Sequence, residues 1–234
     1  MRDSHVEGST ADASKPTTLR SNVEQWKQLQ DLDYFENHPC YMGLRDFDQS
    51  TCATIEAFTP LAPEMNVVVI GCGYGRETAH IAPRVRHVWG IDVSQKILDK
   101  AQKYLTDRGV TNFTPALSDS YKTDIPAKID LVFSIVVMQH LTRDLVVDYF
   151  KHLGEKLNPK GRILVQFVED FMATDEDADL RAYEPSINWT PRQILELSQT
   201  CKLKFIEVRT KQVTPTALWH WALLGAGERE AASG

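Results

Sequence analysis

Apolar and polar residues alternate along the middle of the chain with two different periods. Five short apolar runs have the length and composition of β-strands, at residues 66–71, 87–92, 112–117, 129–136 and 161–167. The first, fourth and fifth runs are almost continuously apolar, which is typical of strands that are covered on both faces. The pattern therefore predicts a parallel sheet that lies between two layers of helices.

Segments with helical periodicity separate these runs. From Ile97 to Leu105, apolar residues recur at the 3.6-residue spacing of one helix face. A second amphipathic helix is predicted over residues 143–157, with Thr142 as its cap and the sequence NPKG at 158–161 as the turn that ends it. Strands and helices that alternate in this way indicate a doubly wound α/β fold.

The pattern changes in the C-terminal third of the chain. The sequence TPRQ at 190–193 has the composition of a capping box with proline at the first helical position, and it predicts a helix. Two further strands are expected at 204–210 and 217–224. Only the six residues KQVTPT join them, which is too few for a helical crossover, so this pair is predicted to be antiparallel.

The predicted organisation is a disordered tail at 1–20, a helical N-terminal segment at 21–60, an α/β domain at 61–226 and a flexible tail at 227–234. Within the N-terminal segment, Ser21 or Asn22 is expected to cap a first helix. A second helix at about 49–59 is expected to end before Pro60, because the residue before a proline disfavours helical geometry.

Composition excludes several classes of function. The 234 residues carry a formal net charge of −6 and no basic stripe, so a nucleic-acid partner is not expected. No apolar run approaches the ~20 residues that a transmembrane helix needs, and the polar N-terminus lacks the apolar core of a secretory signal. We therefore expect a cytoplasmic protein without a membrane span. The cysteines form no CxxC pair, which disfavours a zinc site or a disulfide framework.

The sequence VVVIGCGYGRET at 67–78 leads from the first predicted strand into three glycines, Gly71, Gly73 and Gly75. At the first strand-to-helix turn of a doubly wound sheet, glycines let the backbone approach a bound nucleotide. Asp92 ends the second predicted strand and matches the acidic residue that accepts hydrogen bonds from ribose hydroxyls. Together, these features predict a site for a nucleoside-bearing ligand.

The same stretch disfavours a dinucleotide. The G-x-G-x-x-G fingerprint requires a glycine at position 76, where this chain has Arg76. Glu77 would also place a negative charge where a pyrophosphate binds. An NAD-dependent oxidoreductase is therefore the less favoured alternative, and a ligand with a cationic centre and no phosphate fits better.

These motifs together resemble class I S-adenosylmethionine-dependent methyltransferases over about residues 65–225. VVVIGCGYGRET is similar to the first motif of that family, although Ile70 stands where an acidic or small residue is frequent. GIDVS is similar to the ribose-binding motif, ALSDSYKTDIP to the stretch whose acidic residue faces the adenine amine, and IDLVFSIVVMQHL and LNPKGRILVQF to later motifs. The resemblance implies a Rossmann-like seven-stranded sheet of order 3-2-1-4-5-7-6 with an antiparallel final strand, an N-terminal helical lid, and S-adenosyl-L-methionine as cofactor.

The resemblance also implies which residues form the site. His140 is the candidate general base, with a packing role as the alternative, because related enzymes with unlike substrates often have histidine here. Gln139 is expected either to line the cofactor pocket or to touch substrate, and Arg45 either to pair with the methionyl carboxylate or to lie in a solvated loop. Cys72 is expected to be a small lining residue and not a nucleophile. No metal is expected, and the expected cofactor-binding residues are Tyr41, Arg45, Gly71, Cys72, Gly73, Gly75, Asp92, Val93, Asp119, Ser120, Ile135 and Gln139.

The motifs leave the methyl acceptor open. We expect a small molecule such as a secondary metabolite, a sugar or a lipid precursor, methylated on O, N or C, because the chain has neither a basic stripe nor an NPPY-like segment. The acidic segment at 169–184 either contributes to a site for a cationic acceptor or forms a solvated surface. Trp189, Trp219 and Trp221 either wall the acceptor pocket or pack in the core. A homodimer and a non-catalytic binding protein with this fold remain open alternatives.

Overall fold

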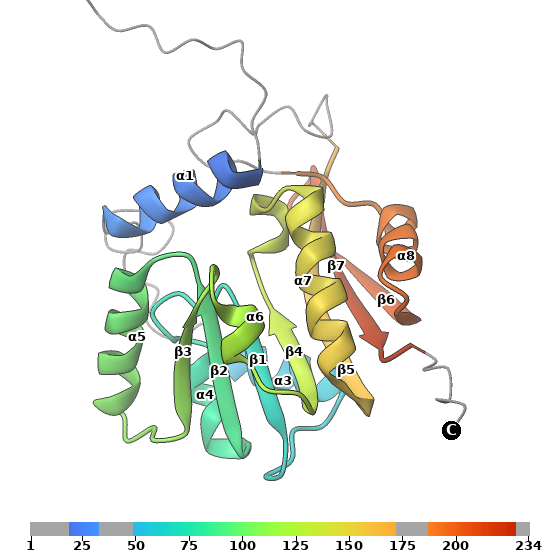
Figure 1. Ribbon diagram of the computed structural model, residues 1–234. Coiled ribbons are helices and arrows are strands. Elements are labelled where there is room, and N and C mark those ends of the chain that lie inside the picture. The colour runs from blue at the N-terminus through green and yellow to red at the C-terminus, as the bar shows by residue number, and fades with distance from the viewer. Residues whose placement is uncertain (1–18, 33–48, 172–186, 228–234) are drawn as a thin grey trace, which may run out of the picture.

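A computed structural model describes residues 19–32, 49–171 and 187–227 of the chain (Figure 1). Tyr41, Arg45 and most of the acidic segment at 169–184 lie outside these described residues, as do the chain ends at 1–18 and 228–234. The expectations for those residues therefore stay predictions.

The described residues form one seven-stranded sheet of order β3-β2-β1-β4-β5-β7-β6. Strands β1 to β5 pair in parallel, and β7 runs antiparallel to both of its neighbours, β5 and β6. The strands are β1 (Asn66–Ile70), β2 (His87–Asp92), β3 (Phe113–Leu117), β4 (Ile129–Ser134), β5 (Leu157–Asp170), β6 (Lys204–Gln212) and β7 (Ala217–Gly225). This order and the antiparallel final pair confirm the predicted fold class.

Successive residues of the central strands face two separate hydrophobic cores, one on each side of the sheet. In β1, Val67 and Val69 belong to one core, while Val68 and Ile70 belong to the other. The first core is covered by α3 (Gln49–Phe58), α4 (Thr78–Ile81), η1 (Ala82–Arg84) and α5 (Gln95–Thr106). The second is covered by α6 (Tyr121–Asp124), α7 (Arg143–Lys156) and α8 (Pro191–Thr200). Burial on both faces explains why β1, β4 and β5 are almost continuously apolar.

The N-terminal helix α1 (Leu19–Asp31) does not join either layer. It lies across the carboxyl ends of the central strands, above the sheet in Figure 1. Trp26 and Leu29 on its inner face are buried and pack against Val93, which follows β2. The helix therefore covers the edge of the sheet at which a doubly wound fold binds its ligand.

Local start and stop signals were predicted with mixed success. The capping box at Thr190 and Gln193 is present, and the helix it opens begins at Pro191, as expected. The first helix begins at Leu19, so the prediction that Ser21 or Asn22 caps it was wrong. Thr142 holds the cap position of α7, but its side chain makes no capping hydrogen bond.

The segment NPKG at 158–161 was expected to be a turn, and it lies instead within β5, which begins at Leu157 immediately after α7. The pairing register between β4 and β5 shifts between Ile129 and Leu131, so the segment 158–161 is accommodated in β5 as a local irregularity of the strand pairing.

Within the described part of the chain, no helix is both long and apolar enough to cross a bilayer.

Candidate active site

A cavity opens at the carboxyl ends of β1, β2 and β4, beneath α1. Its walls come from the glycine loop after β1, the end of β2, the loop after β4, two residues of α1 and one residue of α7. The lining residues are Trp26, Gln30, Ile70, Gly71, Cys72, Gly73, Tyr74, Arg76, Glu77, Ile91, Asp92, Val93, Ile135, Val136, Val137, His140, Leu141 and Tyr149. We call this the central cavity.

The glycine loop requires glycine for backbone and for steric reasons. Gly71, Gly73 and Gly75 all have positive φ angles, of 65°, 52° and 91°. Residues that carry a Cβ rarely adopt such backbone conformations. A Cβ on Gly71 would lie 2.4 Å from Cγ2 of Val137, so the loop after β4 packs directly against the first glycine. A Cβ on Gly75 would lie 3.0 Å from the side chain of Leu105, so the third glycine lets α5 pack closely. The run therefore serves both the cavity wall and helix packing.

Asp92 lies at the centre of this arrangement. Its Oδ2 accepts the N–H of Gly73 at 2.8 Å and its Oδ1 accepts the N–H of Val93 at 2.8 Å. The residue is 5% exposed, and this burial raises the pKa of the carboxyl to about 6, although the backbone N–H groups of Gly73, Val93 and Ser94 act to lower it. A ribose acceptor at this position has to be an ionised carboxylate. A ligand hydroxyl that donates a hydrogen bond to Asp92 would favour that ionised form of the carboxyl.

Arg76 and Glu77 form an ion pair at the cavity wall. Nη2 of Arg76 lies 2.7 Å from Oε1 of Glu77, and Nε of Arg76 donates to the same oxygen at 2.9 Å. Both side chains are largely buried. Arg76 therefore neutralises the negative charge of Glu77 at the cavity wall, and the pair offers no excess positive charge for a pyrophosphate.

Cys72 packs inside the glycine loop. Its thiol is buried and lies 3.6 Å from the carbonyl oxygen of Gly73. Burial and then the nearby Asp92 raise the pKa of the thiol well above its usual range. A thiol in this environment is a poor nucleophile, because the thiolate is the reactive form.

The loop after β4 brings His140 into the cavity and places it against α1. Nε1 of Trp26 donates to the carbonyl oxygen of His140 at 3.0 Å, and the two rings lie 4.5 Å apart between centroids with a tilt of 53°. His140 ends η2 (Met138–His140), a single turn whose Gln139 is buried. The imidazole thus lies at the boundary between the cavity and α1.

The same loop contains a strained residue, Val136, whose φ is +57°. A β-branched residue rarely occupies this left-handed region. Its N–H donates to Oε1 of Gln166 at 2.8 Å, and Gln166 is fully buried in β5. Sequence reasoning did not single out Gln166, although a polar residue inside an otherwise apolar strand was a usable signal.

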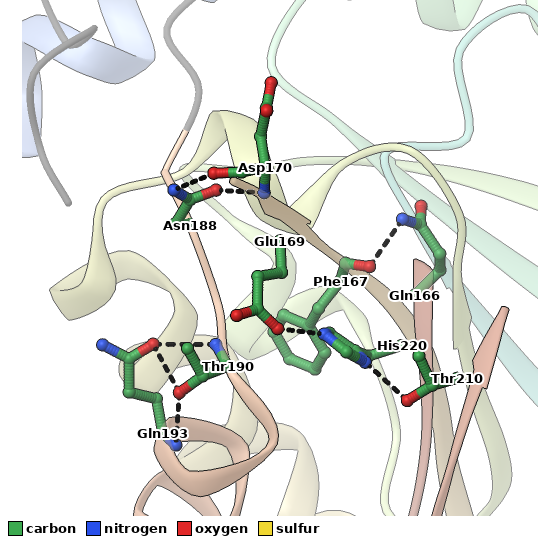
Figure 2. Close-up of polar contacts among 9 residues, drawn as sticks. All are labelled: Gln166, Phe167, Glu169, Asp170, Asn188, Thr190, Gln193, Thr210 and His220. Carbon is green, nitrogen blue, oxygen red and sulfur yellow. Dashed lines mark hydrogen bonds and ion pairs between the residues drawn. The ribbon is translucent and has the colours of Figure 1, made fainter. Parts of the chain in front are cut away.

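Beyond Gln166, polar side chains tie the carboxyl end of β5 to its neighbours (Figure 2). Nε2 of His220 lies 2.8 Å from Oε2 of Glu169, and Nδ1 of His220 lies 2.8 Å from Oγ1 of Thr210. The side-chain amide of Asn188 exchanges two hydrogen bonds with the backbone of Asp170, at 2.8 and 3.0 Å. The contacts of His220 link β5, β6 and β7, and those of Asn188 hold the segment before α8 against the end of β5.

The structure brings together about half of the predicted site residues. Gly71, Cys72, Gly73, Asp92, Val93, Ile135 and His140 line the central cavity. Gly75, Asp119, Ser120 and Gln139 are not among its lining residues, and Asp119 is exposed. Ser120 instead donates to Asp124, and Oε1 of Gln139 is buried without a hydrogen-bond partner in the described chain. Tyr41 and Arg45 fall outside the described residues.

Sequence reasoning missed several residues of the cavity. Trp26 and Gln30 come from α1; the resemblance implied an N-terminal helical lid, but neither residue was singled out as part of the site. Tyr149 belongs to the apolar stripe of α7 and was read as core, yet it also reaches the cavity. Burial, followed by the charges of Asp92, Asp148 and Asp119, raises the pKa of the Tyr149 hydroxyl, which is therefore a neutral donor.

The three tryptophans considered for an acceptor pocket do not line the central cavity. Trp221 is buried and stacks on Phe133, with 6.1 Å between ring centroids, so it is a core residue. Trp189 is buried against Phe167, and its Nε1 has no hydrogen-bond partner in the described chain.

Comparison with known proteins shows which proteins the chain is similar to. Residues 67–161 match the model of a family described as a methyltransferase domain. N-terminal Xaa-Pro-Lys N-methyltransferase 1 of Danio rerio is 32% identical over 99 residues, which cover 41% of this chain and 44% of the relative. Thiocyanate methyltransferase 1 of Brassica oleracea is 26% identical over 116 residues, which cover 49% of this chain and 50% of the relative. The chain thus matches half or less of the length of these curated relatives.

Solved structures share the fold over most of the chain. A phosphoethanolamine N-methyltransferase 2 of Haemonchus contortus, solved with S-adenosylhomocysteine, has a TM-score of 0.70 at 14% identity and covers 91% of this chain and 61% of its own. The magnesium protoporphyrin IX methyltransferase of Synechocystis PCC 6803, solved with S-adenosylmethionine, has a TM-score of 0.63 at 14% identity, with 92% and 100% covered. The [4+2]-cyclase SpnF has a TM-score of 0.70 at 11% identity, with 88% and 97% covered. At these identities the likeness establishes the fold, which hosts more than one chemistry.

Proposed function

From the methyltransferase domain at residues 67–161, set in a seven-stranded sheet of class I methyltransferase order, we propose that this chain is an S-adenosyl-L-methionine-dependent methyltransferase. The observation that carries the proposal is the pairing of Asp92 with Gly73 at the floor of the central cavity. It joins the acidic end of β2 to the glycine loop after β1, the two elements that bind a nucleoside in a doubly wound sheet.

The residues present fit this cofactor. Asp92 supplies buried acceptor oxygens for ribose hydroxyls, and the positive φ angles of Gly71 and Gly73 let the backbone approach the ligand. Ile91, Val93 and Ile135 add apolar walls for a nucleoside base. The Arg76–Glu77 pair lacks the net positive charge that a dinucleotide phosphate would need. These features favour S-adenosyl-L-methionine over NAD.

The protein contributes to methyl transfer mainly by positioning and by excluding water. When bound, S-adenosyl-L-methionine supplies a methyl group on a sulfonium, which is already a good leaving group. The chain must therefore hold the acceptor atom in line with the methyl carbon and keep water out. Helix α1 suits the second task, because Trp26 closes on the carbonyl oxygen of His140 at the cavity rim.

We assign His140 the role of general base for an acceptor that must lose a proton. Histidine is the usual general base of proteins, and His140 lines the cavity beside α1. The contact with Trp26 also gives His140 a structural role, so activity and stability have to be measured separately.

We further propose a small molecule as the acceptor. The support is the position of α1 over the cavity, with Trp26 and Gln30 both buried, which favours a low-molecular-weight ligand over a large surface. The net charge of −6 disfavours a nucleic acid. The relative from Danio rerio, whose name gives a protein N-terminus as its substrate, supports a peptide α-amine as the second candidate.

Calorimetric titration with S-adenosyl-L-methionine, S-adenosylhomocysteine and NAD tests the cofactor. We expect the first two to bind, and Asp92→Ala to weaken both, while the exposed Asp99→Ala on α5 serves as the matched control. Binding of NAD alone would refute the proposal. Binding of none of the three would favour a non-catalytic protein with this fold.

Transfer of a labelled methyl group tests the acceptor class. The enzyme is incubated with labelled cofactor and either the low-molecular-weight fraction of a cell extract or a synthetic peptide that begins Xaa-Pro-Lys. We expect label in the low-molecular-weight fraction only. Label in the peptide alone would replace the small molecule by the peptide amine.

A further inference from the structure

Helix α1 is fixed over the central cavity by contacts in its middle and at its C-terminal end. Toward its middle, Nε1 of Trp26 donates to the carbonyl oxygen of His140 at 3.0 Å. At its end, the carboxylate of Asp31 accepts from Oγ of Ser94, and its carbonyl oxygen accepts from Nζ of Lys96 at 2.7 Å. The residues between Trp26 and Asp31 are therefore held at defined positions above the cavity.

Gln30 lies within this fixed stretch and carries a polar group that lacks a partner. It is only 8% exposed and lines the cavity, and its Oε1 is buried without a hydrogen-bond partner among the described residues. A buried carbonyl oxygen without a donor is unfavourable, and such groups in native structures call for a specific explanation. A leucine or methionine would fill this position of the lid without that cost.

The surroundings of Gln30 indicate which donor would satisfy it. One turn before it, Trp26 packs against Val93 together with Leu29, and Val93 directly follows Asp92. Gln30 and Asp92 thus line the same cavity, on the side where β2 ends. Each oxygen of Asp92 already accepts one backbone N–H and has a lone pair left for a ribose hydroxyl, and Gln30 adds a second acceptor group for a ribose that has two hydroxyl donors.

We propose that Gln30 is a cofactor-binding residue, whose Oε1 accepts a hydrogen bond from a ribose hydroxyl of the bound adenosyl cofactor. The inference rests on the proposed function, because it assumes an adenosyl ligand in the central cavity. It gives α1 a direct part in binding as well as a covering one. The helix then closes more firmly when the cavity is filled, since the ligand supplies the missing donor.

The test compares Gln30→Met with Gln28→Met on the same helix. Methionine keeps the length of the side chain and removes its hydrogen-bonding capacity, and Gln28 is exposed. We expect Gln30→Met to bind S-adenosylhomocysteine about 5- to 10-fold more weakly, as the loss of one neutral hydrogen bond predicts. Gln28→Met should bind like the wild type. The melting temperature of ligand-free Gln30→Met should not fall, because the substitution removes an unsatisfied buried group.

A second titration uses an analogue of S-adenosylhomocysteine that lacks both ribose hydroxyls. We expect the difference between wild type and Gln30→Met to disappear with this analogue. An equal loss with both ligands would overturn the proposal and indicate packing alone, as would unchanged affinity of Gln30→Met for S-adenosylhomocysteine. Failure of the wild type to bind S-adenosylhomocysteine at all would instead refute the proposed function.

Discussion

Gln166 holds Val136 in a left-handed backbone conformation at the wall of the central cavity. Oε1 of Gln166 accepts the N–H of Val136 at 2.8 Å. Nε2 of Gln166 donates to the carbonyl oxygen of Phe167 at 2.8 Å, as Figure 2 shows. The peptide bond before Val136 is trans, so the carbonyl of Ile135 points away from Gln166. The side chain of Gln166 thereby fixes which way this carbonyl faces, in a loop that lines the site.

Gln166→Leu should therefore affect both stability and binding. We expect it to lower the free energy of unfolding by about 1–3 kcal/mol, because the N–H of Val136 loses its partner beside the core. We also expect weaker binding of S-adenosyl-L-methionine, because a φ of +57° at a valine is strained and is kept only by its surroundings. Urea unfolding and calorimetry measure the two effects. Unchanged binding would show that the loop keeps its shape without Gln166.

Gly71→Ala and Gly109→Ala separate backbone strain from steric overlap. Both glycines have positive φ, of 65° and 77°, but a Cβ on Gly109 meets nothing within 4 Å, whereas on Gly71 it would lie 2.4 Å from Val137. We expect Gly109→Ala to cost about 1 kcal/mol of stability, and Gly71→Ala to cost about 2–4 kcal/mol and to abolish cofactor binding. Thermal melts and calorimetry provide the measurements. Equal costs for the two variants would mean that Val137 moves aside without penalty.

The pKa of Asp92 predicts a pH dependence of stability. The folded-state pKa is about 6, above the ordinary value of 3.8, so the folded protein binds more protons than the unfolded chain between these values. Stability should therefore fall as the pH rises through this window and then level off, by roughly 3 kcal/mol in total. Asp92→Asn should lack this component, so the difference in unfolding free energy between wild type and variant is measured at several pH values from 4 to 7. A constant difference would contradict the raised pKa, and Asp99→Asn controls for the loss of a surface carboxylate.

His140→Gln tests the proposed base. We expect the rate of methyl transfer to fall by about 10²- to 10⁴-fold with little change in cofactor affinity, because general bases typically contribute rate enhancements of this size. The acid limb of the pH–rate profile should also disappear. His152→Gln on α7 is the control, because that residue does not line the cavity. A lower melting temperature with unchanged turnover would leave His140 with only its structural contact to Trp26.

The sequence by itself determined the features that depend on near neighbours along the chain. Apolar runs and helical stripes are set by which faces an element buries, so the strands and the antiparallel final pair could be predicted from the pattern, while the strand order followed from the family resemblance. The capping box at Thr190 depends on two residues three positions apart, and it forms as expected. The glycines of the first turn and Asp92 lie at strand ends, so the parallel sheet brings them to the same edge.

Only the tertiary structure decided which distant residues complete the cavity. Trp26 and His140 are 114 positions apart, and no local pattern shows that α1 crosses the carboxyl edge of the sheet to join them. The same holds for Gln30, an ordinary helix residue by sequence, and for Gln166, whose partner Val136 lies on another strand's loop. Helix and strand preferences arise from interactions within a few residues, whereas these contacts depend on how whole elements pack. That packing placed Gln30 over the cavity and left its carbonyl oxygen buried there without a donor in the described chain.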